Sequence, residues 1–251
     1  YFLNTWSNYN TPFVFTIRDN QGKVLSTPIN NEKLKNKIAN YDWAKREAFT
    51  FTTSEGIQLD GWMMKPLNFN PAKRYPVVLF QYSGPGSQQV INSWNAGSMG
   101  QGGAFDAYLA QNDIIVVCVD GRGTGGREAA FEKATYLQLG RLEAKDQVET
   151  ALWLGKQSYV DKDKIGIWGW SFGGFNTLMS MSEGRKVFKA GVAVAAPTDW
   201  KFYDTIYTER YMRTPKENPD GYKDNPISRV NQLEGALLLC HGTADDNVHV
   251  Q

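Results

Sequence analysis

The chain has 251 residues, of which 41% are hydrophobic and 21% are charged, and this composition excludes a disordered or fibrous protein. Its 27 basic and 26 acidic side chains leave a net charge of +1, so the basic excess typical of nucleic-acid-binding proteins is missing. No apolar run reaches the roughly 18 residues that a membrane-spanning helix needs. We therefore expect a globular protein with a sizeable core, built as one large domain or two small ones.

The first forty residues have patterns typical of strands, a turn and a short helix. Residues 13–18 are strand-like, and Asn20-Gln21-Gly22 has the composition of a turn. Residues 31–40 (NEKLKNKIAN) predict a short polar helix. Since these residues cannot form a core alone, we expect 1–40 to be the end of a β unit followed by a linker.

After residue 46 the pattern changes to strands that alternate with helices. Residues 48–53 and 57–65 flank Glu55-Gly56 and predict an antiparallel hairpin. Strands covered on both faces are predicted by five almost continuously apolar runs, at residues 76–82, 114–119, 165–168, 190–195 and 236–240. Helices are predicted between them, over residues 103–111, 140–155, 172–183 and about 200–212. This alternation predicts an α/β fold with a mostly parallel twisted sheet and helices on both faces.

The run Gly169-Trp170-Ser171-Phe172-Gly173 has the pattern G-x-S-x-G and lies between a predicted strand and a predicted helix. In this context the pattern predicts a sharp turn that exposes a nucleophilic serine hydroxyl, here that of Ser171. The glycines avoid Cβ clashes, and the N-terminus of the helix favours developing negative charge. The alternative is a strand–helix turn built from small residues.

A nucleophilic serine needs a base, and the base needs an acid that orients it. The loop after the last predicted strand offers Asp245 and Asp246 as the acid. The chain has two histidines, His241 and His249, and neither lies on a separate, later loop. We predict that both are structural and that the catalytic base lies beyond Gln251, which would leave the active site incomplete.

Two hydrogen-bond donors are needed to stabilise the oxyanion that forms during acyl transfer. The backbone N–H of Phe172, the residue after the nucleophile, would be one of them. Tyr82 lies where an early strand ends and could donate its phenol hydrogen. A buried core tyrosine is an equal interpretation of Tyr82.

Neither a cofactor nor a metal is indicated. The glycine-rich run at residues 120–126 (DGRGTGG) lacks both nucleotide-binding patterns, so a close backbone approach explains it better than phosphate binding. Cys118 and Cys240 lie in apolar runs and are predicted to be buried on strands, in neither a metal site nor a disulfide framework.

Several longer stretches resemble the prolyl oligopeptidase family of serine peptidases, and most of all its dipeptidyl peptidase IV branch. They are residues 82–88 (YSGPGSQ), 120–123 (DGRG), 168–174 (WGWSFGG), 203–212 (YDTIYTERYM) and 241–249 (HGTADDNVH). The resemblance implies that residues 1–40 are the end of a β-propeller and a linker. It implies that residues 41–251 are an α/β-hydrolase domain that is incomplete at its C-terminus.

The resemblance also implies roles for single residues. Ser171 would be the nucleophile, Asp245 the acid of the triad, and Tyr82 the side-chain oxyanion donor beside the Phe172 N–H. A flat apolar pocket for proline would be lined by the ring of Phe172 and by Trp200, Tyr203, Tyr207 and Val248, and Asn247 would contact a peptide carbonyl. Without the resemblance, Trp200, Tyr203 and Tyr207 would indicate only a buried aromatic helix face.

The implied activity is that of a serine dipeptidyl peptidase, which releases N-terminal X-Pro or X-Ala dipeptides through an acyl-enzyme. Its partners would be peptides with a penultimate proline or alanine, and no nucleic acid. Family analogy adds a homodimer and an extracytoplasmic location, in the periplasm, at the cell surface or secreted. The alternatives are a related prolyl endopeptidase, acylaminoacyl peptidase or esterase, or an inactive fragment or binding module. Without a catalytic histidine, the chain alone is expected to be inactive.

Overall fold

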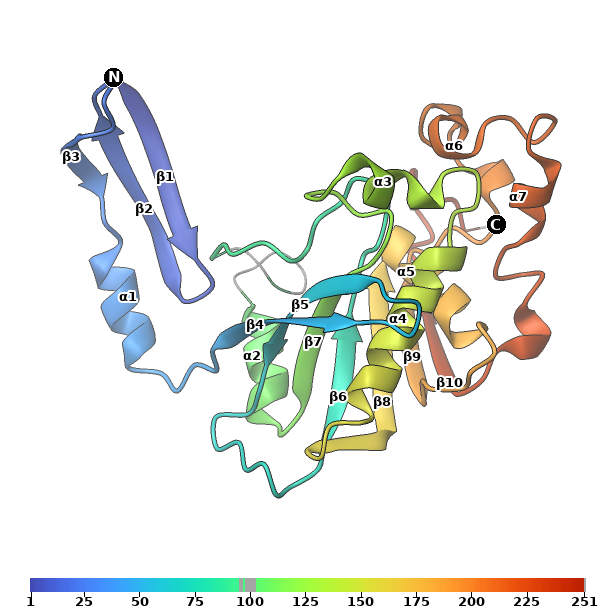
Figure 1. The fold of residues 1–251 in the computed structure, drawn as a ribbon, viewed down its shortest axis with the longest axis horizontal. Coiled ribbons are helices and arrows are strands. Elements are labelled where there is room, and N and C mark those ends of the chain that lie inside the picture. The colour runs from blue at the N-terminus through green and yellow to red at the C-terminus, as the bar shows by residue number, and fades with distance from the viewer. Residues whose placement is uncertain (95–96, 98–102, 251) are drawn as a thin grey trace.

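A computed structural model of the chain describes residues 1–94, 97 and 103–250. Among these residues the strands form two separate sheets, a small one at the N-terminus and a larger one that makes up the body of the molecule (Figure 1). The helices after the first one surround the larger sheet (Figure 1).

The N-terminal sheet is antiparallel, with the order β1 (Phe2–Asn8), β2 (Thr11–Arg18) and β3 (Val24–Ile29). The short helix α1 (Glu32–Ala39) follows it, as predicted. The β1–β2 hairpin contacts the segment that follows β6, because the Tyr9 N–H donates to Asn92 Oδ1 over 3.0 Å and the Trp94 N–H donates to Ser7 Oγ over 3.1 Å. That residues 1–40 are the end of a propeller stays a prediction.

The larger sheet has the strand order β10-β9-β8-β6-β7-β5-β4. Its members are β4 (Arg46–Thr52), β5 (Gln58–Met64), β6 (Tyr75–Phe80), β7 (Ile115–Asp120), β8 (Val160–Trp170), β9 (Ala190–Val194) and β10 (Ala236–Cys240). The strands from β10 to β7 pair in parallel, whereas β5 pairs antiparallel with both β7 and β4. The mostly parallel sheet and the antiparallel hairpin at its edge are therefore confirmed.

Successive side chains of β7 point into two different cores, as expected for a strand covered on both faces. Ile115 and Val117 belong to a core that includes Val148 of helix α4 (Arg141–Leu154). Val116 and Cys118 belong to another core that includes Ala107 of helix α2 (Ala104–Gln111). Helices thus cover both faces of the sheet. Cys118 is a buried strand residue as predicted, whereas the prediction was wrong for Cys240, which lies on β10 but is only partly buried.

The remaining helices are α3 (Ala129–Glu132), α5 (Phe172–Met181), α6 (Thr205–Met212) and α7 (Pro219–Lys223). The prediction of one helix over residues 200–212 was wrong, because a short 3-10 turn at Trp200–Phe202 is separated from α6. The side chain of Asp199 accepts from the Lys201 N–H and that of Asp204 accepts from the Tyr207 N–H. Each aspartate caps its own helical segment, so the chain turns between them.

Within the described ranges, no helix has both the length and the apolar character needed to cross a membrane.

Candidate active site

The carboxyl ends of neighbouring parallel strands bring the predicted catalytic residues to one edge of the sheet. Ser171 follows β8, Tyr82 follows β6 and Asp245 lies in the loop after β10. Two backbone hydrogen bonds of 2.8 Å join these ends, one from the Ser171 N–H to Val194 O and one from the Ala195 N–H to Cys240 O. This is the edge at which open α/β sheets bind their ligands.

The backbone at Ser171 has φ 57° and ψ −117°, a combination that is strained for a residue with a side chain. The turn packs closely against the end of β6. A Cβ atom on Gly169 would lie 2.5 Å from the carbonyl oxygen of Gln81, and one on Gly173 would lie 2.4 Å from the same atom. Both glycines of the motif are therefore required by this contact, and together they support the sharp turn that was predicted.

Gln81, which was not predicted from the sequence, joins the turn to β6. Its side chain is fully buried. Its Nε2 donates to Gly173 O over 2.7 Å and to Thr177 Oγ1 over 3.1 Å, while its Oε1 accepts from Ser83 Oγ at 2.9 Å and from Asn176 Nδ2 at 3.1 Å. The signal in the sequence was an amide side chain directly after a buried apolar strand, a position where polar groups need internal partners.

The side chain of Tyr82 adjoins Ser171, and the interaction with the serine hydroxyl lowers the pKa of the phenol. Burial raises the pKa of Tyr82 more than this interaction lowers it, so the phenol keeps its proton at neutral pH. Phe172 is the first residue of α5, and its N–H therefore lies at the end of the helix that has unpaired donors. Both predicted donors thus adjoin the serine, and their oxyanion role stays a prediction.

Asp245 organises the loop after β10. Its Oδ1 accepts from the Val248 N–H at 3.0 Å and from the Asn247 N–H at 3.1 Å. These two hydrogen bonds, with smaller contributions from His241 and His249, hold the pKa of Asp245 below its usual value. The carboxyl group is therefore ionised at neutral pH, as the acid of a triad must be.

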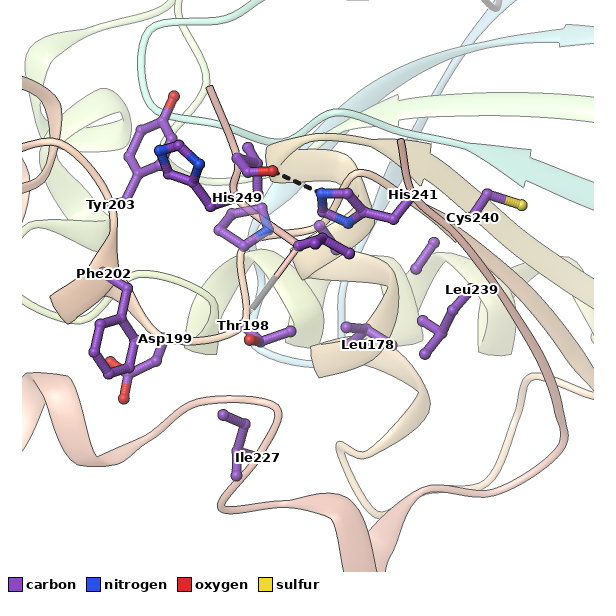
Figure 2. Close-up of a pocket in the computed structure, with 15 residues that line it drawn as sticks. Leu178, Thr198, Asp199, Phe202, Tyr203, Ile227, Leu239, Cys240, His241 and His249 are labelled. Atoms are coloured by element: carbon purple, nitrogen blue, oxygen red, sulfur yellow. Dashed lines mark hydrogen bonds between the residues drawn. The ribbon is translucent and has the colours of Figure 1, made fainter. Parts of the chain in front are cut away.

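His241 contacts the same loop. Its Nε2 lies 2.7 Å from Val248 O, the contact drawn in Figure 2, and 3.7 Å from Asp245 Oδ2. The ring can donate to a carbonyl oxygen only through a protonated Nε2, so this nitrogen is not a free proton acceptor. The contact agrees with a structural role for His241.

The predicted pocket residues form one aromatic cluster next to the turn. The ring of Trp200 lies 5.4 Å from that of Phe172, 5.8 Å from that of Tyr203 and 5.9 Å from that of Tyr207. Trp200 is only 3% exposed, whereas Tyr203 and Tyr207 are half-buried. Burial also raises the pKa of Tyr207, which keeps this phenol neutral. Trp200 therefore forms the buried part of the cluster, and the two tyrosines form its exposed part. Contact of the cluster with a substrate stays a prediction.

Val248 and Tyr203 line a cavity of about 640 Å³. Its walls come from the ends of β9 and β10, from the Asp245 loop and from the segment before α6, and include Pro197, Phe202, Leu239 and His249 (Figure 2). Tyr203 belongs to both the cavity and the aromatic cluster. Its hydroxyl donates to Asn247 Oδ1 over 3.1 Å, so the predicted pocket residues and the predicted carbonyl-binding residue are in direct contact.

Over the part of the chain that the structure describes, no three histidine, cysteine or carboxylate side chains gather in a way that could hold a metal ion.

Comparisons with known proteins agree with this geometry. The family model described as "Prolyl oligopeptidase family" matches residues 105–251, which is more than half of the chain. "Probable dipeptidyl-aminopeptidase B" of Coccidioides posadasii is 45% identical over 244 residues, and the protein of the same name from Sclerotinia sclerotiorum is 44% identical over 247 residues. Each match covers 91% of this chain but only 26% of the relative, so the chain spans about a quarter of their length.

The crystal structure of Porphyromonas gingivalis dipeptidyl peptidase 4 superposes on 99% of this chain with a TM-score of 0.92 and 45% identity, and the match covers 35% of that chain. With this likeness, the strand order and the serine turn after β8 identify an α/β-hydrolase fold. The chain belongs to the prolyl oligopeptidase family of serine peptidases.

Proposed function

We propose that this chain is the catalytic part of a longer serine dipeptidyl peptidase that releases N-terminal X-Pro or X-Ala dipeptides. The main observation is that Ser171 lies on a strained strand–helix turn and adjoins Tyr82. The names of the matched relatives support the dipeptidyl specificity. The aromatic cluster beside the turn suits a rigid apolar ring such as proline.

In the proposed reaction, Ser171 Oγ attacks the carbonyl carbon of the residue at the second position of the peptide. The oxygen of the tetrahedral intermediate accepts hydrogen bonds from the Tyr82 hydroxyl and the Phe172 N–H. The scissile C–N bond then breaks, the shortened peptide leaves as an amine, and water hydrolyses the acyl-enzyme. A histidine base, oriented by Asp245, would take the proton from Ser171 Oγ and give it to the leaving amine.

The experiment uses the full-length protein and a chromogenic Gly-Pro anilide, with a free or a blocked amino terminus. Cleavage of the free substrate alone is expected. Cleavage of the blocked substrate would instead favour the endopeptidase or acylaminoacyl peptidase alternative.

Labelling with a fluorophosphonate tests the nucleophile separately. We expect labelling of the wild type and of Ser158→Ala, an exposed serine far from the site, and none of Ser171→Ala. Labelling without cleavage of either anilide would favour an esterase. An unlabelled, folded wild type would favour a binding module and overturn the proposal.

Family analogy also supports a homodimer and an extracytoplasmic location as further proposals. Sedimentation and fractionation of the full-length protein test them.

A further inference from the structure

Asp120, the last residue of β7, binds the segment that follows Tyr82. We call residues 82–90 the Tyr82 loop. Asp120 Oδ2 accepts from the Val90 N–H at 2.8 Å and from the Gln89 N–H at 2.9 Å, and its Oδ1 lies 3.2 Å from the same Gln89 nitrogen. The carboxyl group is buried, with 9% of the residue exposed. Hydrogen bonds from backbone N–H groups to a buried carboxylate are among the stronger ones in proteins.

The residues directly after Asp120 bind the middle of the same loop. The Gly86 N–H donates to Gly123 O over 3.1 Å, and the Gly125 N–H donates to Ser87 O over 2.8 Å. Within the loop, Ser87 Oγ donates to Gly84 O over 2.6 Å. The conformation of the Tyr82 loop is therefore set by hydrogen bonds with β7 and with the turn that follows it.

The backbone of the Tyr82 loop in turn supports the Tyr82 ring. A Cβ atom on Gly84 would lie 2.7 Å from the Tyr82 ring and 3.2 Å from the Phe172 ring, so the loop backbone at Gly84 contacts both side chains. At the other end, the loop begins next to Gln81, which is bonded to α5. A shift of the loop would therefore move the Tyr82 hydroxyl relative to Ser171.

We propose that Asp120 is a positioning residue, which holds the Tyr82 loop so that the Tyr82 hydroxyl stays within hydrogen-bond reach of an oxyanion at Ser171. The proposal rests on the proposed function, because it takes Tyr82 as an oxyanion donor. Asp120 itself touches the loop and not the substrate, and its effect on the reaction must pass through Tyr82. The complete loss of one oxyanion donor reduces kcat by roughly 100- to 1000-fold. A donor that is only displaced should reduce kcat by a smaller but measurable factor.

Asp120→Asn in the full-length protein is the first test. The asparagine keeps the size of the side chain, but its NH₂ group replaces one acceptor oxygen and faces a backbone N–H. We expect kcat for Gly-Pro anilide to fall about 10-fold or more, with KM changed less than about 2-fold, because the donor acts in the transition state.

Asp60→Asn is the matched control. Asp60 is the register partner of Asp120 on β5, but it is exposed and its Oδ1 accepts from Thr50 Oγ1 at 2.7 Å, not from the Tyr82 loop. We expect this variant to keep kcat within about 2-fold, since exposed substitutions have small effects.

A double-mutant cycle with Tyr82→Phe separates positioning from general destabilisation. If Asp120 acts through Tyr82, then Asp120→Asn should reduce kcat less than about 2-fold further when Tyr82 is already phenylalanine. Independent, multiplicative losses would overturn the proposal, and so would an unchanged kcat in Tyr82→Phe. In that last case cleavage of the anilide would still leave the proposed function intact.

Two further measurements keep the proposal testable. If neither anilide is cleaved, the rate of fluorophosphonate labelling of Ser171 replaces kcat in the same cycle, so that failure of the proposed specificity is distinguished from failure of this proposal.

If Asp120→Asn does not fold, Ser87→Ala removes a weaker contact of the same loop. Its loss of rate must also disappear in the Tyr82→Phe background, and a loss that persists there contradicts the proposal.

Discussion

The Tyr203 hydroxyl donates a hydrogen bond to the Asn247 side chain over 3.1 Å, and this contact joins the aromatic cluster to the loop of Asp245. On one side, the ring of Tyr203 packs edge-on against Trp200. On the other side, the N–H of Asn247 binds Asp245. The predicted apolar pocket and the predicted acid are therefore coupled through one phenol.

Removal of that phenol oxygen, in Tyr203→Phe, should weaken substrate binding more than it slows the reaction. The phenyl ring can keep its contact with Trp200, but Asn247 loses the donor that orients its side chain. A hydrogen bond of ordinary strength predicts a KM for Gly-Pro anilide raised about 3- to 10-fold, with kcat changed less than about 2-fold. Tyr108→Phe, an exposed tyrosine of α2, is the control and should behave as wild type. A loss confined to kcat would instead place the hydroxyl in the chemical step.

Trp200 should matter to stability as well as to the pocket. It is 3% exposed and contacts the rings of Phe172 and Phe175, at centroid distances of 5.4 Å and 4.9 Å. Trp200→Ala would leave a cavity and is expected to reduce the free energy of unfolding by about 3–5 kcal/mol. Phe202→Ala, two residues away and 84% exposed, should reduce it by less than about 1 kcal/mol. Urea denaturation of both variants measures the difference, and equal losses would show that Trp200 is not a core residue.

The elements that hold the site were predictable where the pattern in the sequence is local. The apolar runs identified the parallel strands, and G-x-S-x-G located the turn at Ser171. Strand β8 begins at Val160 and not at the predicted residue 165, because its first half is polar and no apolar pattern marks it. The break before α6 was not predicted from the sequence pattern either. It results from side-chain hydrogen bonds at the caps Asp199 and Asp204, which compete with a continuous helix.

The residues that support the site were not predictable, because their partners are far away in the sequence. Gln81 binds Gly173, which lies 92 residues later, and Asp120 binds the N–H of Gln89, 31 residues earlier. No spacing rule connects such pairs. Each is a polar residue at the end of a buried apolar strand. Polar residues at such positions can be sought in other sequences, because they need internal hydrogen-bond partners.

The glycines of the serine turn can be tested one at a time. Gly173→Ala would place a methyl group 2.4 Å from Gln81 O, so β6 and α5 must move apart and Ser171 must move away from Tyr82. We expect kcat/KM to fall more than about 10-fold and the free energy of unfolding to fall by about 1–3 kcal/mol. Gly166→Ala on β8 is the control, because its Cβ would meet its nearest atom at an ordinary 3.4 Å. Comparable activity losses in both variants would contradict the close-packing argument.

Glu143, a buried residue of α4, should make stability depend on pH. It is fully buried, and Oε2 accepts from the Gly140 N–H at 2.9 Å. Burial raises the pKa of Glu143 to about 8 against the opposing effect of backbone hydrogen bonds, whereas an unfolded glutamate has a pKa of about 4.3. Between these values the folded state binds more protons than the unfolded state. Its stability therefore falls as the pH rises, by at most about 1.4 kcal/mol per pH unit from this group.

Glu143→Gln removes this titration. As the pH rises from 5.5 to 8, the wild type should therefore lose unfolding free energy through this group, whereas the variant should not. Glu149→Gln on the same helix is the matched control. Burial of Glu149 is outweighed by hydrogen bonds from Ser54 and Arg185, which lower its pKa, so this group is ionised in both states above about pH 5.5. Its substitution should cost a constant amount across that range. Parallel pH profiles of wild type and Glu143→Gln in urea denaturation would show that Glu143 is not a buried neutral acid.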